Sequence, residues 1–271
     1  MLIKIISLCL VFITVFISCK KDTEAIPGDT YIPLIRKVNV TAQPYSEYVY
    51  NNANLLTEEK SKFNFMNYHY DEKYQLVSVD YYSDKDLLSN DVNVLEKALS
   101  IKGLMSFVNA EIGSTVKYEY ATNGQLIKTI VSNPLNSSSE YSEYRYDVNF
   151  RLSRQTIFWE NKVSGFIDYL YDGRGNLSKE TLSSVTSSGV AELSTTTQYE
   201  FDNNKNPFKA FYRLMTPGIN TNTNNIIKET LTIHFKPGQG TDIIQITLNT
   251  YTYNSKGYPL RKNSTVEYLY E

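Results

Sequence analysis

The sequence predicts an all-β protein, a curved antiparallel meander of repeated Tyr-x-Tyr hairpins that could roll into a partly closed barrel. Three observations support this: a Tyr-x-Tyr pair recurs along the chain, β-prone stretches follow each pair, and turn-forming residues lie between them. Residues at i and i+2 of a strand point to the same face, so each tyrosine pair marks one apolar face. A two-sheet β-sandwich is the alternative architecture.

The repeat unit is a Tyr-x-Tyr pair followed by a leucine. In the first five copies the leucine stands six residues after the second tyrosine, as Leu177 does after Tyr171. In the sixth and seventh copies Pro207 and Pro259 take that place. Fifteen of the 23 tyrosines belong to these pairs, so the aromatic excess is the repeat itself. The copies begin at Tyr48, Tyr68, Tyr118, Tyr144, Tyr169, Tyr199, Tyr251 and Tyr268.

Each unit is expected to form a strand, a tight turn and a second strand. The segment between the tyrosines and the leucine is rich in Asp, Asn and Gly, which tolerate positive φ and close hairpins. We therefore interpret the repeated aspartates, such as Asp172, as turn residues and not as catalytic groups. The tyrosine row, backed by leucine, is interpreted as the core of the sheet, with its hydroxyls at the rim.

Two longer intervals interrupt the repeat. Leu88, Val92, Leu95 and Leu99 recur at helical spacing in the first, which predicts one inserted amphipathic helix at about residues 84–104. The second interval contains Pro and Gly between two β-prone runs and predicts a further hairpin. Stretches rich in Ser, Thr and Asn are expected to be loops; they cover residues 133–139, 183–197 and 216–225.

The copy from Tyr169 to Leu177 has the pattern Tyr-x-Tyr-Asp-x-x-Gly-x-Leu. It resembles the YD repeats of the Rhs and teneurin families, and the resemblance covers about residues 48–271. The layout is also similar to small lipoproteins of unknown function from the Bacteroidota, in which one copy ends in Asn-Pro-Phe, as residues 206–208 do here. This resemblance implies extended antiparallel sheet. The chain is far too short to enclose a cargo, as the shells of large YD proteins do.

The first 18 residues have the pattern of a secretory signal peptide. A lysine at position 4 precedes an almost wholly apolar run up to Ile17, and the small Ser18 follows. The apolar run is shorter than the roughly 20 residues of a membrane-spanning helix. The stretch from Phe16 to Cys19 resembles the lipobox of bacterial lipoproteins, which implies cleavage before Cys19 and a diacylglycerol on its thiol.

Residues 19–33 carry Pro and Gly and little apolar content, so they are expected to form a flexible tether before a β-repeat domain at 34–271. The charged tract from Lys20 to Glu24 resembles the surface-export signal of Bacteroidota lipoproteins. The resemblance implies a lipid-anchored protein of the outer membrane that faces the cell surface, with a periplasm-facing orientation as the alternative. The domain lacks cysteine, so its stability must come from its own core.

No motif for catalysis or cofactor binding stands out. The two histidines, His69 and His234, share no motif, and neither a Gly-x-Ser-x-Gly elbow nor a phosphate-binding loop occurs. Asp202 to Asn206 has oxygens at alternate positions but lacks the central Gly and distal Glu of a calcium loop. A net charge of −2 gives no electrostatic footprint for nucleic acid. We therefore expect no enzymatic activity, no cofactor or metal and no nucleic-acid partner.

These features predict a non-catalytic binding or scaffold module with a glycan or a protein as its ligand. Its other partner would be the membrane, through lipid on Cys19. The candidate ligand contacts are Trp159, which is the single tryptophan, and the Tyr169–Tyr171 pair, since aromatic rings stack on sugar faces. The alternative is a hydrolase of the envelope that uses two carboxylates. A closely facing Asp/Glu pair in a deep cleft would favour the hydrolase.

Overall fold

The computed structural model describes residues 33–271, except 62–63, 85–109, 135, 212–220 and 237. The chain divides into two units, Met1–Ile32 and Pro33–Glu271, and the description concerns the second. The signal peptide, Cys19 and the tether up to residue 32 therefore lie outside the described residues. So does the predicted helix, apart from Asp84, which ends strand β5.

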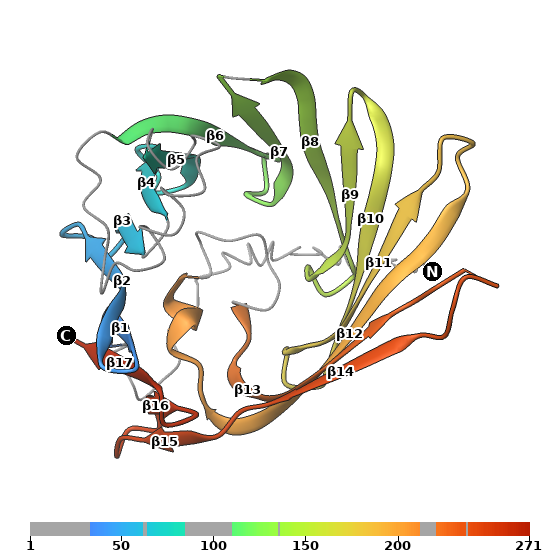
Figure 1. Cartoon of the computed structure of the whole chain (residues 1–271). Helices are drawn as coiled ribbons and strands as arrows, with labels where there is room; N and C mark the ends of the chain where they lie inside the picture. Colours follow the sequence, from blue (N-terminus) through green and yellow to red (C-terminus); the bar gives the residue numbers. More distant parts are fainter. Residues whose placement is uncertain (1–32, 62–63, 85–109, 135, 212–220, 237) are drawn as a thin grey trace, which may run out of the picture. The chain divides into compact units, whose positions relative to one another are not determined.

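The described part of the chain is all-β and forms one 17-stranded antiparallel sheet (Figure 1), as predicted, with no second sheet to make a sandwich. A short 3₁₀ helix, η2 (Pro207–Phe211), follows strand β12. The strands are β1 (Ile35–Val40), β2 (Gln43–Tyr50), β3 (Leu56–Ser61), β4 (Phe65–Tyr70), β5 (Leu76–Asp84), β6 (Ala110–Tyr120), β7 (Leu126–Asn133), β8 (Asn136–Tyr146), β9 (Leu152–Trp159), β10 (Lys162–Tyr171), β11 (Leu177–Val185), β12 (Ala191–Lys205), β13 (Asn224–Ile233), β14 (Ile243–Leu248), β15 (Tyr251–Tyr253), β16 (Pro259–Lys262) and β17 (Val266–Tyr270).

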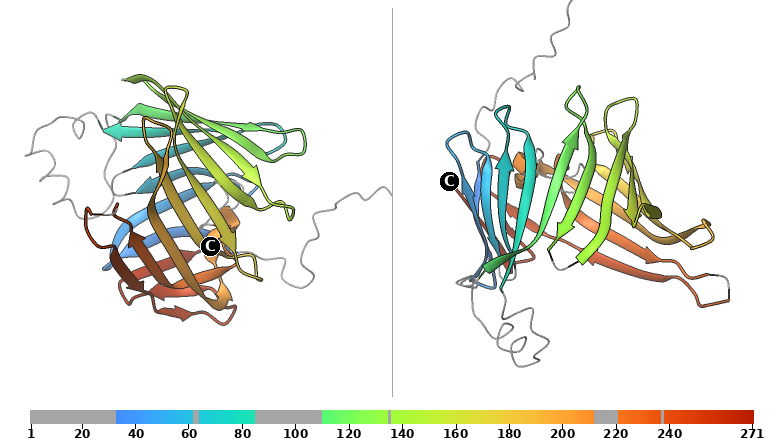
Figure 2. Two further views of the ribbon diagram at one scale, coloured as in Figure 1. Left: turned by 90° about the vertical axis from the view of Figure 1, so that its right-hand side faces the viewer. Right: turned by 90° about the horizontal axis from the view of Figure 1, so that it is seen from above.

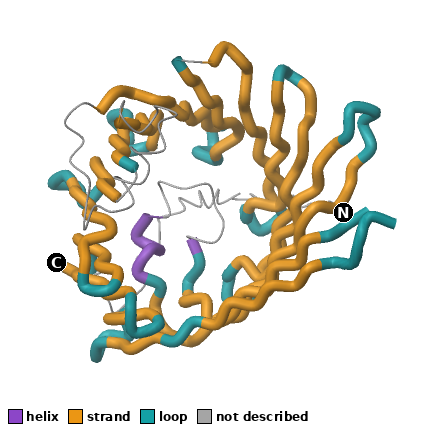
Figure 3. The backbone as a smooth tube through the Cα atoms, viewed as in Figure 1, coloured by secondary structure: helices purple, strands orange, loops and turns teal. Residues whose placement is uncertain are grey.

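Successive strands pair with each other from β1 to β14 and from β15 to β17, and β17 pairs with β1. Strand β14 pairs with β13 and strand β15 with β16, and no ladder joins β14 to β15 among the described residues, so a continuous ladder does not close the sheet into a barrel. The sheet curves, and η2 lies on its concave side (Figures 2 and 3). The strand direction changes gradually around the sheet in Figure 2, as expected from the twist that strands of L-amino acids impose on a sheet.

In the first five copies the leucine of the repeat lies opposite the second tyrosine, across a β-bulge. Tyr169 pairs with Glu180 and Leu170 with Lys179, but Tyr171 pairs with Leu177, so Ser178 is the extra residue. The Ser178 hydroxyl donates to the Leu170 carbonyl at 3.1 Å. The same register shift precedes Tyr50, Tyr70, Tyr120, Tyr146 and Tyr253.

The turn between the tyrosines and the leucine is closed by its first side chain. Asp71 Oδ1 accepts hydrogen bonds from the backbone N–H groups of Lys73 and Gln75 at 2.9 and 2.8 Å. The fourth residue has a left-handed conformation, with φ of 62° at Tyr74 and 85° at Gly175. Asp and Gly recur in the repeat because the turn needs this acceptor and this φ. Asn51, Asp147, Asp172 and Asn254 close their turns in the same way.

The first tyrosine of most pairs is buried, as the repeat predicts. Most buried hydrophobic residues form two clusters that both contact Tyr118. One contains Ile35, Val38, Tyr48, Leu56, Tyr68, Leu76, Val79, Phe211 and Tyr268, and the other contains Leu126, Tyr144, Leu152, Tyr169, Leu177 and Tyr199. Phe211 brings η2 into the first cluster, with its ring centroid 5.4 Å from that of Tyr48.

Candidate functional site

A cavity of about 220 Å³ opens on the face of the sheet that carries the buried tyrosines. Its walls come from segments far apart in the sequence: η2 and the residue before it, the start of β13, the junction between β14 and β15, and strands β16 and β17. The lining consists of Asn206, Pro207, Phe208, Asn224, Asn225, Ile226, Glu229, Asn249, Tyr251, Lys262 and Tyr268.

Three aromatic rings, with Pro207 and Ile226, form the apolar part of the lining. The Phe208 ring lies edge-on to Tyr268, with centroids 6.1 Å apart, and it also contacts Phe211 at 5.7 Å. Tyr251 donates its hydroxyl to the Ile226 carbonyl at 3.0 Å, which fixes its ring against β13. Packing against the first core cluster and a hydrogen bond to the backbone thus hold these rings in place before any ligand arrives.

Glu229 and Lys262 are the charged residues of the lining. Neither side chain makes a hydrogen bond or an ion pair with any residue that the structure describes. Burial lowers the pKa of the Lys262 ammonium, and the nearby Glu229 carboxylate partly offsets that effect. Lys262 is held opposite Tyr251 in the β15–β16 ladder, and Glu229 lies opposite Tyr199 in the β12–β13 ladder. One carboxylate and one ammonium therefore border the same cavity.

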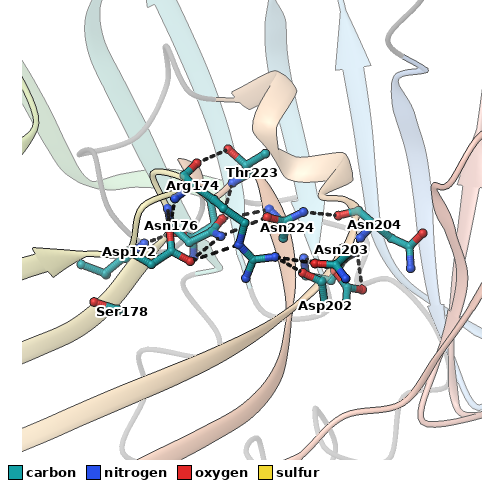
Figure 4. Close-up of polar contacts among 12 residues, drawn as sticks. Asp172, Arg174, Asn176, Ser178, Asp202, Asn203, Asn204, Thr223 and Asn224 are labelled. Carbon is teal, nitrogen blue, oxygen red and sulfur yellow. Dashed lines mark hydrogen bonds and ion pairs between the residues drawn. The ribbon is translucent and has the colours of Figure 1, made fainter.

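A network of buried amides holds the wall formed by residues 222–225 (Figure 4). Asn176 is 0% exposed, and its Oδ1 accepts the backbone N–H groups of Thr223 and Asn224 at 2.8 and 3.0 Å. Its Nδ2 donates to Asp172 Oδ2 and to Asn224 Oδ1, both at 3.0 Å. The turn of the fifth repeat copy is thereby tied to the segment that enters β13.

Asp202 anchors the other side of this wall. Its carboxylate accepts the backbone N–H groups of Asn204 and Asn225, both at 3.0 Å, and the Tyr253 hydroxyl. Arg174 Nη1 donates to the Asp202 carbonyl at 2.7 Å and to Asn203 Oδ1 at 2.8 Å (Figure 4). The oxygens of Asp202 and Asn203, which belong to the stretch that resembles part of a calcium loop, thus accept hydrogen bonds from the chain itself. The described residues include no group of three or more His, Cys, Asp or Glu side chains placed to bind a metal.

The predicted ligand contacts lie away from this cavity. Trp159 ends β9 and is 44% exposed, whereas Tyr169 is 8% exposed and donates its hydroxyl to Gln155 at 3.0 Å. Tyr171 is half-buried, and the Arg151 guanidinium lies 4.9 Å from the centre of its ring. The structure therefore does not bring Trp159 and the Tyr169–Tyr171 pair together on one platform, and a ligand role for each stays a prediction.

Sequence reasoning missed the cavity residues because they belong to copies that depart from the repeat. Phe208 follows Pro207 in the sixth copy, where the other copies have the leucine. Lys262 follows the similarly placed Pro259 of the seventh copy. These departures were visible in the sequence and are the signal that could have located the site. Glu229 lies in the interval between these two copies, where no repeat position predicts which face of the sheet its side chain occupies.

No protein-family model matches the sequence, and no curated protein matches it either. Among solved structures, a porin-like protein from Bacteroides uniformis ATCC 8492 is 10% identical, with a TM-score of 0.40 and coverage of 88% of this chain and 98% of that one. A porin-like protein from Bacteroides vulgatus ATCC 8482 is 11% identical, with a TM-score of 0.41 and coverage of 88% and 99%.

The structure of TcdB2-TccC3 is 14% identical, with a TM-score of 0.30 and coverage of 78% of this chain and 10% of that one. At these identities and TM-scores, no property of the three proteins is carried over to the present chain. In the part of the chain that the structure describes, no helix has the length and apolar character needed to cross a membrane.

Proposed function

We propose that the chain is a non-catalytic binding module of the cell envelope that takes a neutral sugar residue, such as the end of a glycan, into this cavity. The observation that supports it is the lining itself. Three fixed aromatic rings adjoin one carboxylate and one ammonium, and neither charged side chain has a hydrogen bond or an ion pair with a described residue. Aromatic rings pack on the C–H faces of a sugar, while the two charged groups accept from and donate to its hydroxyls.

The size and charge of the cavity favour a small, uncharged ligand. Its volume of about 220 Å³ lies below the roughly 300–1,000 Å³ of pockets for drug-sized molecules. The opposite charges of Glu229 and Lys262 leave the site without a net preference for an anion or a cation. Hydrogen bonds to charged groups are worth about 1.5–3 kcal/mol each, so two of them give a small polar ligand useful affinity.

A binding role fits the lining better than the alternative of a carboxylate-dependent hydrolase. Glycosidases use two carboxyl groups about 5–9.5 Å apart on either side of the scissile bond. Glu229 is the one carboxylate in the described lining. Two carboxylates outside the lining have hydrogen-bond partners: Asp202 accepts the Asn225 N–H and the Tyr253 hydroxyl, and Glu180 on β11 accepts the Tyr199 hydroxyl at 2.9 Å.

Titration calorimetry of the full chain with a panel of neutral monosaccharides and short glycans tests this proposal. Glu229→Gln and Lys262→Met should each weaken binding of the best ligand about tenfold or more, the loss expected for one charged hydrogen bond. The matched controls are Glu200→Gln and Lys228→Met. These residues form an ion pair at 2.7 Å on the opposite face of β12 and β13, and their replacement should leave affinity unchanged.

Absence of binding across the panel would refute the sugar proposal, as would equal losses in the cavity variants and in the controls. Incubation of the same glycans with the parent chain distinguishes a binding module from a hydrolase. If the parent chain releases a shorter glycan and Glu229→Gln does not, the protein is a hydrolase.

The location in the envelope rests on the lipobox-like stretch before Cys19. We expect the mature chain to begin at Cys19 and to carry lipid on its thiol. Mass spectrometry of the membrane-extracted protein would detect an N-terminal lipid-modified cysteine. Cys19→Ala should release the chain from the membrane, and an intact Ser18–Cys19 bond in the mature protein would contradict the anchor. Protease added to intact cells then distinguishes a surface orientation from a periplasmic one.

A further inference from the structure

Strand β14 has one unpaired edge in the part of the chain that the structure describes. It pairs with β13 along all six of its residues, from Ile243 opposite Ile233 to Leu248 opposite Lys228. All six β14 residues are exposed, and Ile244, Ile246 and Leu248 are 63, 56 and 67% exposed. Figure 1 shows β14 as the outer member of the β12–β13–β14 part of the sheet.

The strand lacks the features that normally protect a sheet edge. Soluble proteins place charges, proline or a bulge on an edge strand to prevent pairing with another chain. The stretch from Ile243 to Leu248 contains no charged residue and no proline, and its register to β13 runs without a shift. An uncharged, unbulged strand of six β-prone residues is a template for strand addition.

The directions of the backbone N–H and C=O groups show which of them can pair with another strand. Asn249 donates its N–H to the Ile227 carbonyl, toward β13. Because these directions alternate along a strand, the N–H and C=O groups of Ile244, Ile246 and Leu248 point to the unpaired edge. The side chains of these three residues share the face of Lys228, opposite to that of Glu229 in the cavity.

We propose that a second copy of this chain occupies the edge, with β14 pairing antiparallel to β14 about a two-fold axis at Ile246. This register places Ile244 opposite the partner copy's Leu248 and Ile246 opposite itself. On the other face it places Gln245 opposite Thr247. The strand is thus self-complementary on both faces, apolar against apolar and polar against polar, and no like charges meet. The residues that pair are also the ones whose backbone groups face the edge.

The predicted dimer is weak and reversible. Standard protein–protein interfaces use about 20–30 residues from each partner, whereas this strand supplies only six residues and their immediate neighbours. Association should therefore depend on protein concentration, and the cavity on the opposite face should stay open in both copies.

Disulfide trapping tests the register in the full chain after replacement of Cys9 and Cys19 by serine. Ile246→Cys should form a linked dimer under mild oxidation. A hydrogen-bonded antiparallel pair has Cα atoms about 5.5 Å apart, within the range for a disulfide. Leu248→Cys is the matched control and should stay unlinked, because two copies of residue 248 would lie about 14 Å apart along the strands. Sedimentation should show a concentration-dependent dimer that Ile246→Lys abolishes while the melting temperature stays unchanged.

Three outcomes would overturn the proposal. The first is a parent chain that stays monomeric at millimolar concentration, with no more linked dimer for Ile246→Cys than for Leu248→Cys. The second is equal linkage of both cysteine variants, which would indicate unspecific aggregation. The third is a monomer whose co-sedimentation with phosphatidylethanolamine–phosphatidylglycerol vesicles is lost in Ile246→Lys, which would make the strand a membrane contact. The cysteine comparison decides the register even if Ile246→Lys fails to fold.

Discussion

At the scale of single residues, the second tyrosine of the repeat connects one hairpin to the previous one. The hydroxyl of Tyr146 donates to the Leu126 carbonyl at 2.8 Å, and that of Tyr70 donates to the Leu56 carbonyl at 2.7 Å. Tyr50, Tyr120 and Tyr270 make the equivalent bond to Ile35, Leu76 and Pro259. The acceptor is the carbonyl of the residue that starts the return strand of the previous hairpin, or that starts β1 in the case of Tyr50, where a bulge disrupts the ladder. The recurring spacing of tyrosine and leucine along the chain is therefore explained by hydrogen bonding as well as by packing.

Tyr171 departs from this arrangement, because its buried hydroxyl has no hydrogen-bond partner among the described residues. We expect Tyr146→Phe to lower the free energy of unfolding by about 1 kcal/mol, since it leaves a carbonyl without its donor. Tyr171→Phe should be neutral or slightly stabilising, because it removes a buried polar atom without a partner. Urea denaturation of both variants gives the comparison. An equal loss in both would mean that the Tyr171 hydroxyl is satisfied in solution.

At the scale of elements, the turn decides which residues the repeat can tolerate. The fourth turn position has a left-handed φ in the first five copies and in the seventh, yet Asn54, Tyr74 and Phe150 occupy it as well as glycine. A residue with a Cβ atom costs roughly 1–2 kcal/mol in this conformation. The glycine of the consensus is therefore a requirement of the backbone that some copies violate at the expense of stability.

Substitutions at Tyr74 and Gly175, which both occupy the fourth turn position, test this explanation. Tyr74→Gly should raise the free energy of unfolding by about 0.5–1 kcal/mol, because the left-handed penalty exceeds the entropy that glycine adds to the unfolded chain. Gly175→Ala should lower it by about 1 kcal/mol; no atom lies within 4 Å of the added Cβ, so the loss would come from the backbone alone. Thermal unfolding measures both. A stabilising Gly175→Ala would contradict the explanation.

The turn carboxylates also make stability depend on pH. Partial burial of Asp172 favours its protonated form, but hydrogen bonds from Asn176 and Arg174 and the Arg174 charge outweigh it and lower the Asp172 pKa. A pKa below that of the unfolded chain means that the ionised group stabilises the fold above about pH 4. This contribution is lost as the pH falls through the folded pKa.

Urea midpoints at pH 7 and pH 3 would show this dependence. We expect Asp172→Asn to destabilise the protein at pH 7, because an amide cannot accept from Asn176 at both oxygens. The variant should then lose less stability than the parent between the two pH values. A parallel decline of parent and variant would show that Asp172 does not contribute.

The sequence predicted the strand-turn-strand unit because period-two tyrosines, the turn acceptor and the leucine are local signals. It was wrong about two polar stretches expected to be loops. Residues 183–197 are mostly strand, with a five-residue turn at Thr186–Val190, and most of 133–139 belongs to β7 and β8. Neighbouring strands override the loop-like composition there, since Thr195 and Thr196 pair with Leu182 and Thr181. The cavity depends on contacts between residues more than 50 positions apart, such as Phe208 and Tyr268, and no local pattern encodes these.

At the scale of the whole repeat domain, η2 joins parts of the sheet that the ladder keeps apart. Phe208 and Phe211 come from the segment after β12, yet Phe211 packs on Tyr48 of β2 and Phe208 on Tyr268 of β17. The first core cluster contains the N-terminal strands and β17, and η2 fills the space between their tyrosines. The same short helix forms a wall of the cavity through Phe208. Stability of the domain and formation of the candidate site therefore depend on one segment.

Phe211→Ala should lower the free energy of unfolding by about 3–5 kcal/mol, the usual loss for a large buried aromatic side chain. Phe211 is 2% exposed, whereas Trp159 is 44% exposed and serves as the control; Trp159→Ala should cost far less. If η2 also positions the cavity, Phe211→Ala should weaken sugar binding although Phe211 does not line it. Urea denaturation and calorimetry on the same samples separate the two effects. A stable Phe211→Ala variant with unchanged affinity would show that the sheet alone, without η2, holds both the core and the cavity.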